Sequence, residues 1–186
     1  ANNVSRQSDH ILSILDIHYG FLNGIADKMG KSEDLLSDEN MDMLVSICDN
    51  TDFERTALIE ADGTSHYDNG AVKNVAERLY FKEAIRGKET LSDPLESSVD
   101  QETRVILSVP VYQNGKVVAV LGGSYNVTAL SRMLFDDIFD GAGYSLIVTM
   151  EGEIIAYDGE PAYHKITYGD NFFKFYDSKT LLGVNE

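Results

Sequence analysis

Side chains that could recognise a small molecule gather in one short stretch of this chain. Arg78, Tyr80, Phe81 and Glu83 follow one another closely at the start of a predicted helix. Aromatic rings supply stacking walls at small entropic cost, and an arginine grips a carboxylate through two parallel N–H donors. This combination is typical of a binding pocket. The alternative is structural: Arg78 would then pair with a nearby acid, and the rings would belong to the core.

Two serines on the strands predicted further along the chain extend this candidate site. A period of two places Ser124 on one strand face with Gly122, and Ser108 on one face with Ile106. A serine hydroxyl among apolar neighbours needs a hydrogen-bond partner, and a ligand could be that partner.

No motif for catalysis or metal binding accompanies this group. The sequence has no GxSxG turn, no HExxH helix, no phosphate-binding glycine loop and no EF-hand loop. One cysteine and four scattered histidines exclude a multi-cysteine zinc or iron–sulfur site. Asp136, Asp137 and Asp140 could bind a cation, although a solvated acidic surface is the simpler interpretation. We therefore expect no enzyme, no metal and no cofactor.

Composition excludes further classes. The 186 residues include 15 basic and 31 acidic side chains, a net charge of −16, which repels nucleic-acid phosphates and anionic lipid. A hydrophobic content of 43% is enough for a folded core. No apolar run reaches the roughly 18 residues of a membrane span. The chain starts at Ala1 without a methionine, so we interpret it as a piece of a larger protein.

Two helices are predicted before the first strand. Over the first thirty residues, Val4, Ile11, His18 and Ile25 recur every seven positions beside further apolar rows. This stripe is wider than one buried face needs, so part of it is expected to pack on a second copy of the chain. The alternative is that all of it faces the chain's own core. Ser37 then caps a second helix, whose predicted inner face is Met41, Leu44, Val45 and Cys48.

Strands follow with a period of two. Residues 57–61 and 65–67 form a predicted hairpin around Asp62-Gly63, and a short helix covers about 79–86. A longer hairpin runs over 104–126, where Asn114-Gly115 favours a type I′ turn. Pro110 has no N–H for a ladder, so it should lie at an edge or a bulge.

The first hairpin pattern occurs twice. Residues 147–152 match 58–63, and the strand that follows at 154–159 resembles 65–70, an offset of 89 positions. Two related α+β units in tandem would explain this pattern. A chance match of two generic hairpins is the alternative.

The order of several short motifs resembles the double Cache sensor family, over nearly the whole chain. The motifs are ERLYFKEA at 77–84, GK at 87–88, LSDP at 91–94, ILSVPVY at 106–112 and GKVVAVLGG at 115–123. The resemblance implies an α+β fold with a long N-terminal helix (1–36), a membrane-distal PAS-like unit (37–140) and the start of a truncated or reduced membrane-proximal unit (141–186).

What the family implies is an extracytoplasmic sensor. It would be anchored by membrane spans outside this chain, would form a homodimer through the N-terminal helix, and would feed a histidine kinase, a chemoreceptor or a diguanylate cyclase. A small ligand would bind the distal unit between the sheet and the Arg-Tyr-Phe segment.

The sequence departs from the family members that bind amino acids. Those members have Arg followed by Trp and Tyr, then Tyr and Asp after an Asp-Pro pair, and an Asp at the strand end. The corresponding residues here are Arg78, Tyr80, Phe81, Leu95, Ser97 and Ser124. A serine cannot supply the charge that holds an ammonium group. We therefore expect a small carboxylate, or another uncharged or anionic metabolite, and no typical α-amino acid.

Two other classes stay open. A secreted or lipid-anchored solute-binding protein would have no membrane span after the second unit. A purely structural dimer module would have its distal cavity filled by side chains such as Tyr80 and Phe81.

Overall fold

The computed structural model describes residues 2–96, 103–127, 130, 145–148, 151–158 and 171–174. They belong to two compact units: Ala1–Ser92 with Val105–Tyr125, and Asp93–Arg104 with Asn126–Glu186. The domain boundaries expected after residues 36 and 140 stay predictions. The acidic group at 136–140 lies outside the described residues.

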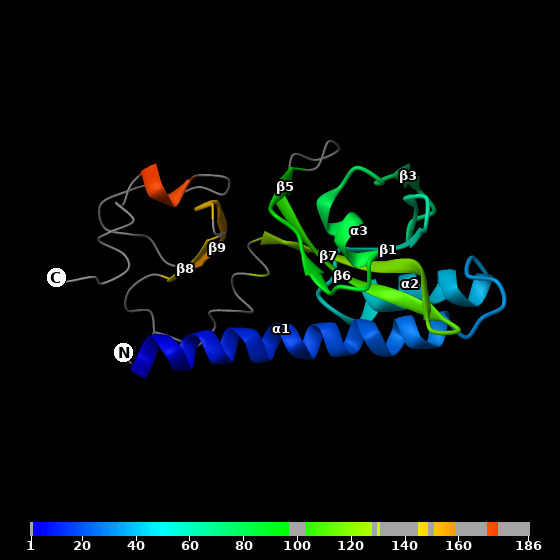
Figure 1. Ribbon diagram of the computed structural model, residues 1–186, viewed down its shortest axis with the longest axis horizontal. Helices are drawn as coiled ribbons and strands as arrows, with labels where there is room; N and C mark the ends of the chain where they lie inside the picture. Colours follow the sequence, from blue (N-terminus) through cyan, green and yellow to red (C-terminus); the bar gives the residue numbers. More distant parts are fainter. Residues whose placement is uncertain are drawn as a thin grey trace. The chain divides into compact units, whose positions relative to one another are not determined.

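The first unit combines helices with one mainly antiparallel sheet, which confirms the predicted α+β class (Figure 1). The sheet order is β3-β2-β1-β7-β6-β4, and β5 pairs with the first two residues of β6, a pairing that belongs to the second unit. The bounds are α1 Asn2–Met29, α2 Asp38–Asn50, β1 Arg55–Glu60, β2 Thr64–Tyr67, β3 Val72–Asn74, α3 Leu79–Ala84, β4 Thr90–Leu91, β5 Leu95–Glu96, β6 Thr103–Gln113 and β7 Lys116–Asn126.

The long helix α1 is apolar on more than one side. Leu22, Ala26 and Met29 are buried against the unit, whereas Ile17 and Phe21 are exposed. The predicted width of the stripe is therefore confirmed, while its contact with a second copy stays a prediction. Among the described residues, no helix is both long and apolar enough to cross a membrane.

The second helix begins where the sequence predicted, but one residue of its predicted inner face was wrong. The Ser37 hydroxyl accepts a hydrogen bond from the backbone N–H of Asn40 at 3.4 Å and caps α2. Its buried residues are Asn40, Leu44 and Ile47, and Val45 is 41% exposed. The amide of Asn40 donates to the carbonyl of Leu35 at 2.9 Å, so a polar contact with the preceding loop sets the inner face.

Both long strands of the second hairpin follow the prediction. Asn114 and Gly115 have φ of 51° and 76°, as a type I′ turn requires. The strand β4 pairs with β6 only at Leu107 and Ser108. Pro110 lies beyond that pairing, so among the described strands only β7 flanks it, and its edge position is confirmed.

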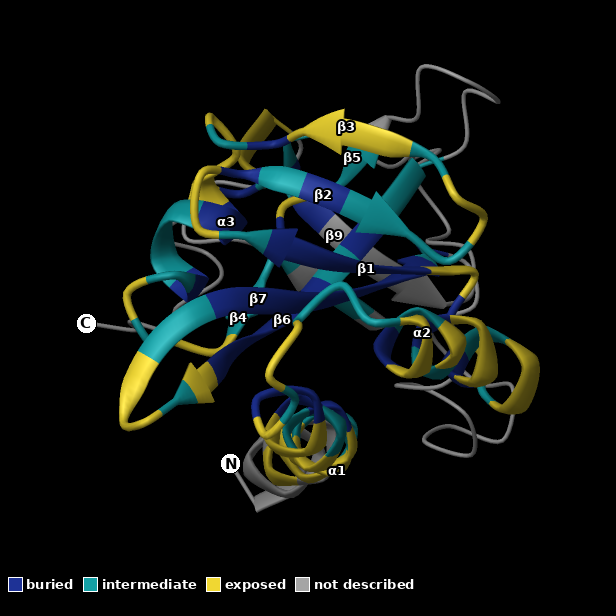
Figure 2. Cartoon of the chain, turned by 90° about the vertical axis from the view of Figure 1, so that its right-hand side faces the viewer, coloured by how far each residue is buried: buried dark blue, intermediate teal, exposed yellow. Residues whose placement is uncertain are grey.

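The helices cover opposite faces of this sheet. Thr56 donates its hydroxyl to the carbonyl of Leu44 on α2 at 2.8 Å. The Tyr125 hydroxyl lies 2.7 Å from Nδ1 of His18 on α1, so this histidine of the apolar stripe packs against the sheet. On the other face, Thr90 donates to the carbonyl of Tyr80 in α3 at 3.3 Å. Figure 2 shows the central strands β1, β6 and β7 as largely buried and β3 as the exposed edge.

The second unit contains the predicted repeat of the first hairpin. Strands β8, Ser145–Val148, and β9, Ile154–Asp158, pair antiparallel, and a 3-10 turn, η1, covers Phe172–Lys174. The two hairpin glycines, Gly63 and Gly152, have φ of 87° and 88°.

The likeness extends to the segment that returns to each turn. The backbone N–H of Val75 donates to Gly63 O at 2.8 Å, and that of Phe172 donates to Gly152 O at 2.7 Å. Before each donor stands an asparagine, Asn74 or Asn171, whose side chain accepts from the second residue after it at 3.1 and 3.0 Å. This shared local structure supports the interpretation as two related units. The two asparagines are farther apart in the sequence than 89 residues, so the repeat offset of the hairpins does not align them.

Candidate ligand-binding site

A small cavity lies on the α3 side of the sheet in the first unit. Its volume is about 30 Å³. Strands β1, β2, β6 and β7 and helix α3 supply the lining residues Arg55, Thr56, Ala57, Ile59, Ser65, Tyr67, Tyr80, Ile106, Gly122 and Ser124.

Small side chains on neighbouring strands leave this space open. Ala57 pairs with Gly122, and Arg55 pairs with Ser124. Directly opposed residues of an antiparallel pair point to the same face, so these positions share one floor. A Cβ at Gly122 would meet the Ser108 hydroxyl at 3.5 Å, which is ordinary contact. The backbone at position 122 would therefore accept a side chain, and the effect of glycine there is to leave space above the sheet.

Two buried hydroxyls at this floor lack a hydrogen-bond partner among the described residues. They are the Oγ atoms of Ser65, 1% exposed, and Ser108, fully buried. Ser65 lines the cavity, and Ser108 lies beside Gly122. Ser124 differs, because its hydroxyl donates to the carbonyl of Arg55 at 3.4 Å. Most buried hydroxyls are paired, so the two unpaired ones mark a place where a ligand atom would be stabilised.

Two tyrosines add phenol groups to the cavity wall. Burial raises the pKa of Tyr80 well above its ordinary range, nearby Tyr67 raises this pKa further, and Arg78 opposes the shift. Its phenol is therefore neutral at physiological pH and can donate a hydrogen bond. Tyr80 is on a helix of only six residues that begins without a side-chain cap.

One arginine that was not among the residues predicted from the sequence lines the cavity. Arg55 donates from Nη1 to Oδ2 of Asp68 at 3.0 Å. The other carboxylate oxygen of Asp68 accepts from the backbone N–H of Thr56 at 3.0 Å. The Arg55 side chain is 50% exposed, and that of Asp68 is 8% exposed. The carboxylate is thus occupied, while most guanidinium N–H groups have no partner in the described part of the chain.

The structure brings only part of the predicted site together. Tyr80 and Ser124 line the cavity, Ser108 lies beside it, and Phe81 is buried but is not a lining residue. Arg78 is exposed at the first turn of α3 and makes no ion pair with another described residue.

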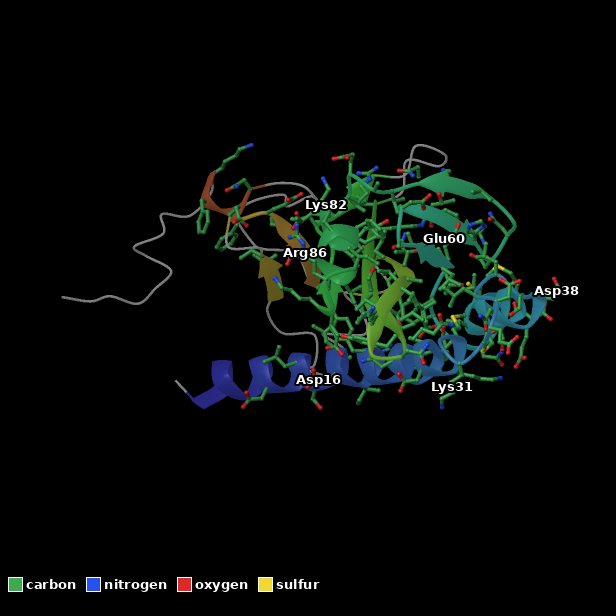
Figure 3. The ribbon with its side chains drawn as sticks, turned by 45° about the vertical axis from the view of Figure 1, so that its right-hand side comes forward. Asp16, Lys31, Asp38, Glu60, Lys82 and Arg86 are labelled. Atoms are coloured by element: carbon green, nitrogen blue, oxygen red, sulfur yellow. The ribbon has the colours of Figure 1, made fainter. Side chains whose placement is uncertain are left out.

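Glu83 lies on α3 outside the cavity lining. It forms ion pairs with Lys88 and, at 3.3 Å, with Arg86, which Figure 3 shows at the end of α3. A hydrogen bond from Lys88 lowers the pKa of Glu83, with charge attraction as a second cause. Its two oxygens are therefore occupied by local cations. Ser97, the remaining position of the predicted motif, lies outside the described residues.

A second, larger groove is open to solvent at the end of α1. Its volume is about 590 Å³, and Asp27, Lys31, Glu33, Tyr112 and Gln113 are among its lining residues (Lys31 is labelled in Figure 3). The charges in it are mixed, and it contains neither of the unpaired buried hydroxyls. In the described part of the chain, no three His, Cys, Asp or Glu side chains are grouped as a metal site.

Comparisons with known proteins identify this architecture. No protein-family model matches the chain. The ligand-binding domain of the Pseudomonas aeruginosa PAO1 chemoreceptor PctC, solved with GABA, superposes with a TM-score of 0.66 at 18% identity, over 83% of this chain and 73% of that one. The domain of Pseudomonas fluorescens CtaA with L-serine gives 0.68 at 19% identity, over 82% and 67%.

A histidine kinase shares the fold as well. The sensor domain of Vibrio cholerae DctB gives a TM-score of 0.64 at 18% identity, over 84% of this chain and 64% of that one. All three are sensor or ligand-binding domains. The chain therefore has the fold of the ligand-binding sensor domains of bacterial chemoreceptors and histidine kinases, and the resemblance to the double Cache family is confirmed at the level of fold.

Proposed function

We propose that this chain is the extracytoplasmic ligand-sensing domain of a bacterial transmembrane receptor, and that it is not an enzyme. The receptor would be a histidine kinase, a chemoreceptor or a diguanylate cyclase. A small metabolite binds in the cavity between the first-unit sheet and α3. The observation that carries this proposal is the pair of unpaired, buried hydroxyls of Ser65, which lines that cavity, and Ser108, which lies beside it, in a fold used by ligand-binding domains.

Ligand binding requires the cavity to widen. Its volume of about 30 Å³ is close to the share of one water molecule in the liquid. Tyr80 is the lining residue on α3, and a helix of six residues has little stability of its own. We propose that a ligand displaces Tyr80 with α3, and that the liganded state favours one arrangement of the receptor by population shift.

The partner proposed for α1 is a second copy of this chain. Ile17 and Phe21 are four residues apart on one helix face, and both are exposed. Burying them in a homodimer would remove apolar surface from water. The membrane anchors proposed for the receptor would lie outside this chain.

The structural-module alternative is favoured by one observation, the small cavity volume. A thermal-shift screen of metabolites separates it from a sensor, because a ligand of the folded state raises the Tm by mass action. The screen compares wild type with Gly122→Val, which fills the cavity floor, and with Gly24→Val, at an exposed position on α1 with open space around it. We expect at least one compound to stabilise wild type and Gly24→Val, and not Gly122→Val.

Two results would contradict the sensor proposal. If no metabolite raises the Tm of wild type, the structural module is the better account. If Gly122→Val responds as strongly as wild type, the ligand binds elsewhere. A membrane span encoded after residue 186 would separate a receptor from a solute-binding protein.

A further inference from the structure

The cavity has a charge pattern that points to one class of ligand. Arg55 is the single charged residue among those that line it. The nearest carboxylate in the hydrogen-bond pattern is that of Asp68, and both its oxygens are already bound, by Arg55 and by the backbone of Thr56. An ammonium group entering the cavity would therefore meet no available carboxylate from the described lining.

The ion pair with Asp68 orients Arg55. A guanidinium carries five N–H donors, and the bond to Asp68 is made by Nη1 alone. Holding the side chain in place beforehand lowers the entropy cost of binding an anion. Because half of the Arg55 side chain is exposed, an incoming carboxylate can reach it from solvent.

The other polar residues that line the cavity are neutral. Ser65 lies opposite Ile59, and Ser124 lies opposite Arg55. Four residues separate Ile59 from Arg55 along β1, which is roughly 14 Å at about 3.4 Å per residue. The cavity as observed, about 30 Å³, does not span this distance, so a ligand that reaches both Ser65 and Arg55 must extend along β1 as the cavity widens.

We propose that Arg55 binds the anionic group of the ligand, and that the ligand is an elongated carboxylate whose far end carries a neutral hydrogen-bonding group for Ser65. This inference rests on the proposed function, and it specifies the ligand class of that same site. It differs from the expectation based on sequence, which assigned the carboxylate to Arg78. Arg78 is exposed on α3 and is not a lining residue.

The test uses matched straight-chain probes of three to six carbons and measures the change in Tm and the Kd by calorimetry. The probes are the carboxylate, its ω-hydroxy and ω-amino forms, and the neutral primary amide. We expect the ω-hydroxy carboxylate to bind best and the amide to cause no shift. The ω-amino form should bind more weakly than the ω-hydroxy form, because its ammonium lacks a carboxylate partner.

Three variants assign the roles. In Arg55→Gln, the loss of a charge-assisted hydrogen bond should weaken carboxylate binding at least about tenfold. Arg78→Gln is the matched control, with binding within about twofold of wild type. Ser65→Ala should remove the advantage of the ω-hydroxy carboxylate over the unsubstituted one and leave the latter unchanged.

Each contrary outcome has a definite meaning. The inference is wrong if no carboxylate of the series shifts the Tm, if Arg55→Gln binds like wild type, or if Arg78→Gln alone loses binding. A neutral or cationic metabolite whose effect disappears in Gly122→Val would also overturn it, yet would leave the proposed sensor function standing. The stability of each unliganded variant, measured first, separates loss of folding from loss of binding.

Discussion

The two unpaired hydroxyls allow a prediction whose sign is opposite to the usual effect of a core substitution. Ser65→Ala and Ser108→Ala each remove a buried oxygen that has no hydrogen-bond partner among the described residues. Burying a hydroxyl without a partner costs about 1–3 kcal/mol. The void left by one oxygen, roughly 10 Å³ at about 24 cal/mol per Å³, costs only about 0.2 kcal/mol.

The expected result is a gain in the free energy of unfolding for the ligand-free protein. The difference between the two contributions is about 1–3 kcal/mol in favour of each alanine variant. Thr56→Val is the matched control, because Thr56 is equally buried but donates its hydroxyl to Leu44 O at 2.8 Å. Losing a satisfied hydrogen bond should lower the free energy of unfolding by about 1 kcal/mol.

Urea denaturation of the three variants and wild type measures these changes, with an unchanged m-value as the condition for comparing midpoints. If Ser65→Ala and Ser108→Ala lose stability as Thr56→Val does, their hydroxyls are satisfied in the folded protein. The reasoning that reserves them for a ligand would then be refuted. A gain in stability together with weaker ligand binding would be typical of a site in which stability is sacrificed for function.

Three further predictions concern the frame of the site. In urea denaturation, Gly63→Ala should lower the free energy of unfolding more than Gly70→Ala. Both glycines have positive φ, but only at Gly63 would an added Cβ meet the Ala76 backbone, at 2.6 Å. Equal losses of free energy in the two variants would contradict this steric argument. Burial lowers the pKa of His18 in the folded protein, with Asp52 opposing, so its contribution to stability should be complete above the unfolded pKa and lost as the pH falls from that value to the lower folded pKa. A His18→Gln variant should show a flatter pH profile of Tm, and an unchanged profile would contradict this assignment. The double variant Ile17→Glu, Phe21→Glu should shift the chain from dimer to monomer in analytical sedimentation, with little change in Tm. If the wild type is a monomer at every concentration, the α1 dimer is excluded.

Local features of the chain were predictable from its sequence. The type I′ turn at Asn114-Gly115, the Ser37 cap and the short helix near Tyr80 depend on the conformational preferences of a few adjacent residues. The width of the α1 stripe and the edge position of Pro110 likewise follow from periodicity and from the chemistry of one residue.

Predictions about which side chain faces which neighbour succeeded less often. Val45 was expected to face inward, and a polar contact of Asn40 with the preceding loop instead sets the inner face of α2. Glu83 was expected at the site, but Lys88 and Arg86 take up its carboxylate. Both outcomes depend on contacts with residues outside the helix, which the periodicity of one helix does not predict.

The sequence alone determined that this is an acidic α+β chain built on a long helix and paired strands. The evidence for this lay in its composition, the order of its motifs and the alternation along single strands. Only the tertiary structure decided which residues enclose the cavity. Strand register sets Gly122 beside Ala57 and Ser124 beside Arg55, and a shift by one residue would turn each of them to the other face. Because register is fixed by the packing of the whole sheet, the place of Arg55 and Ser65 in the site became apparent only once the strands were paired.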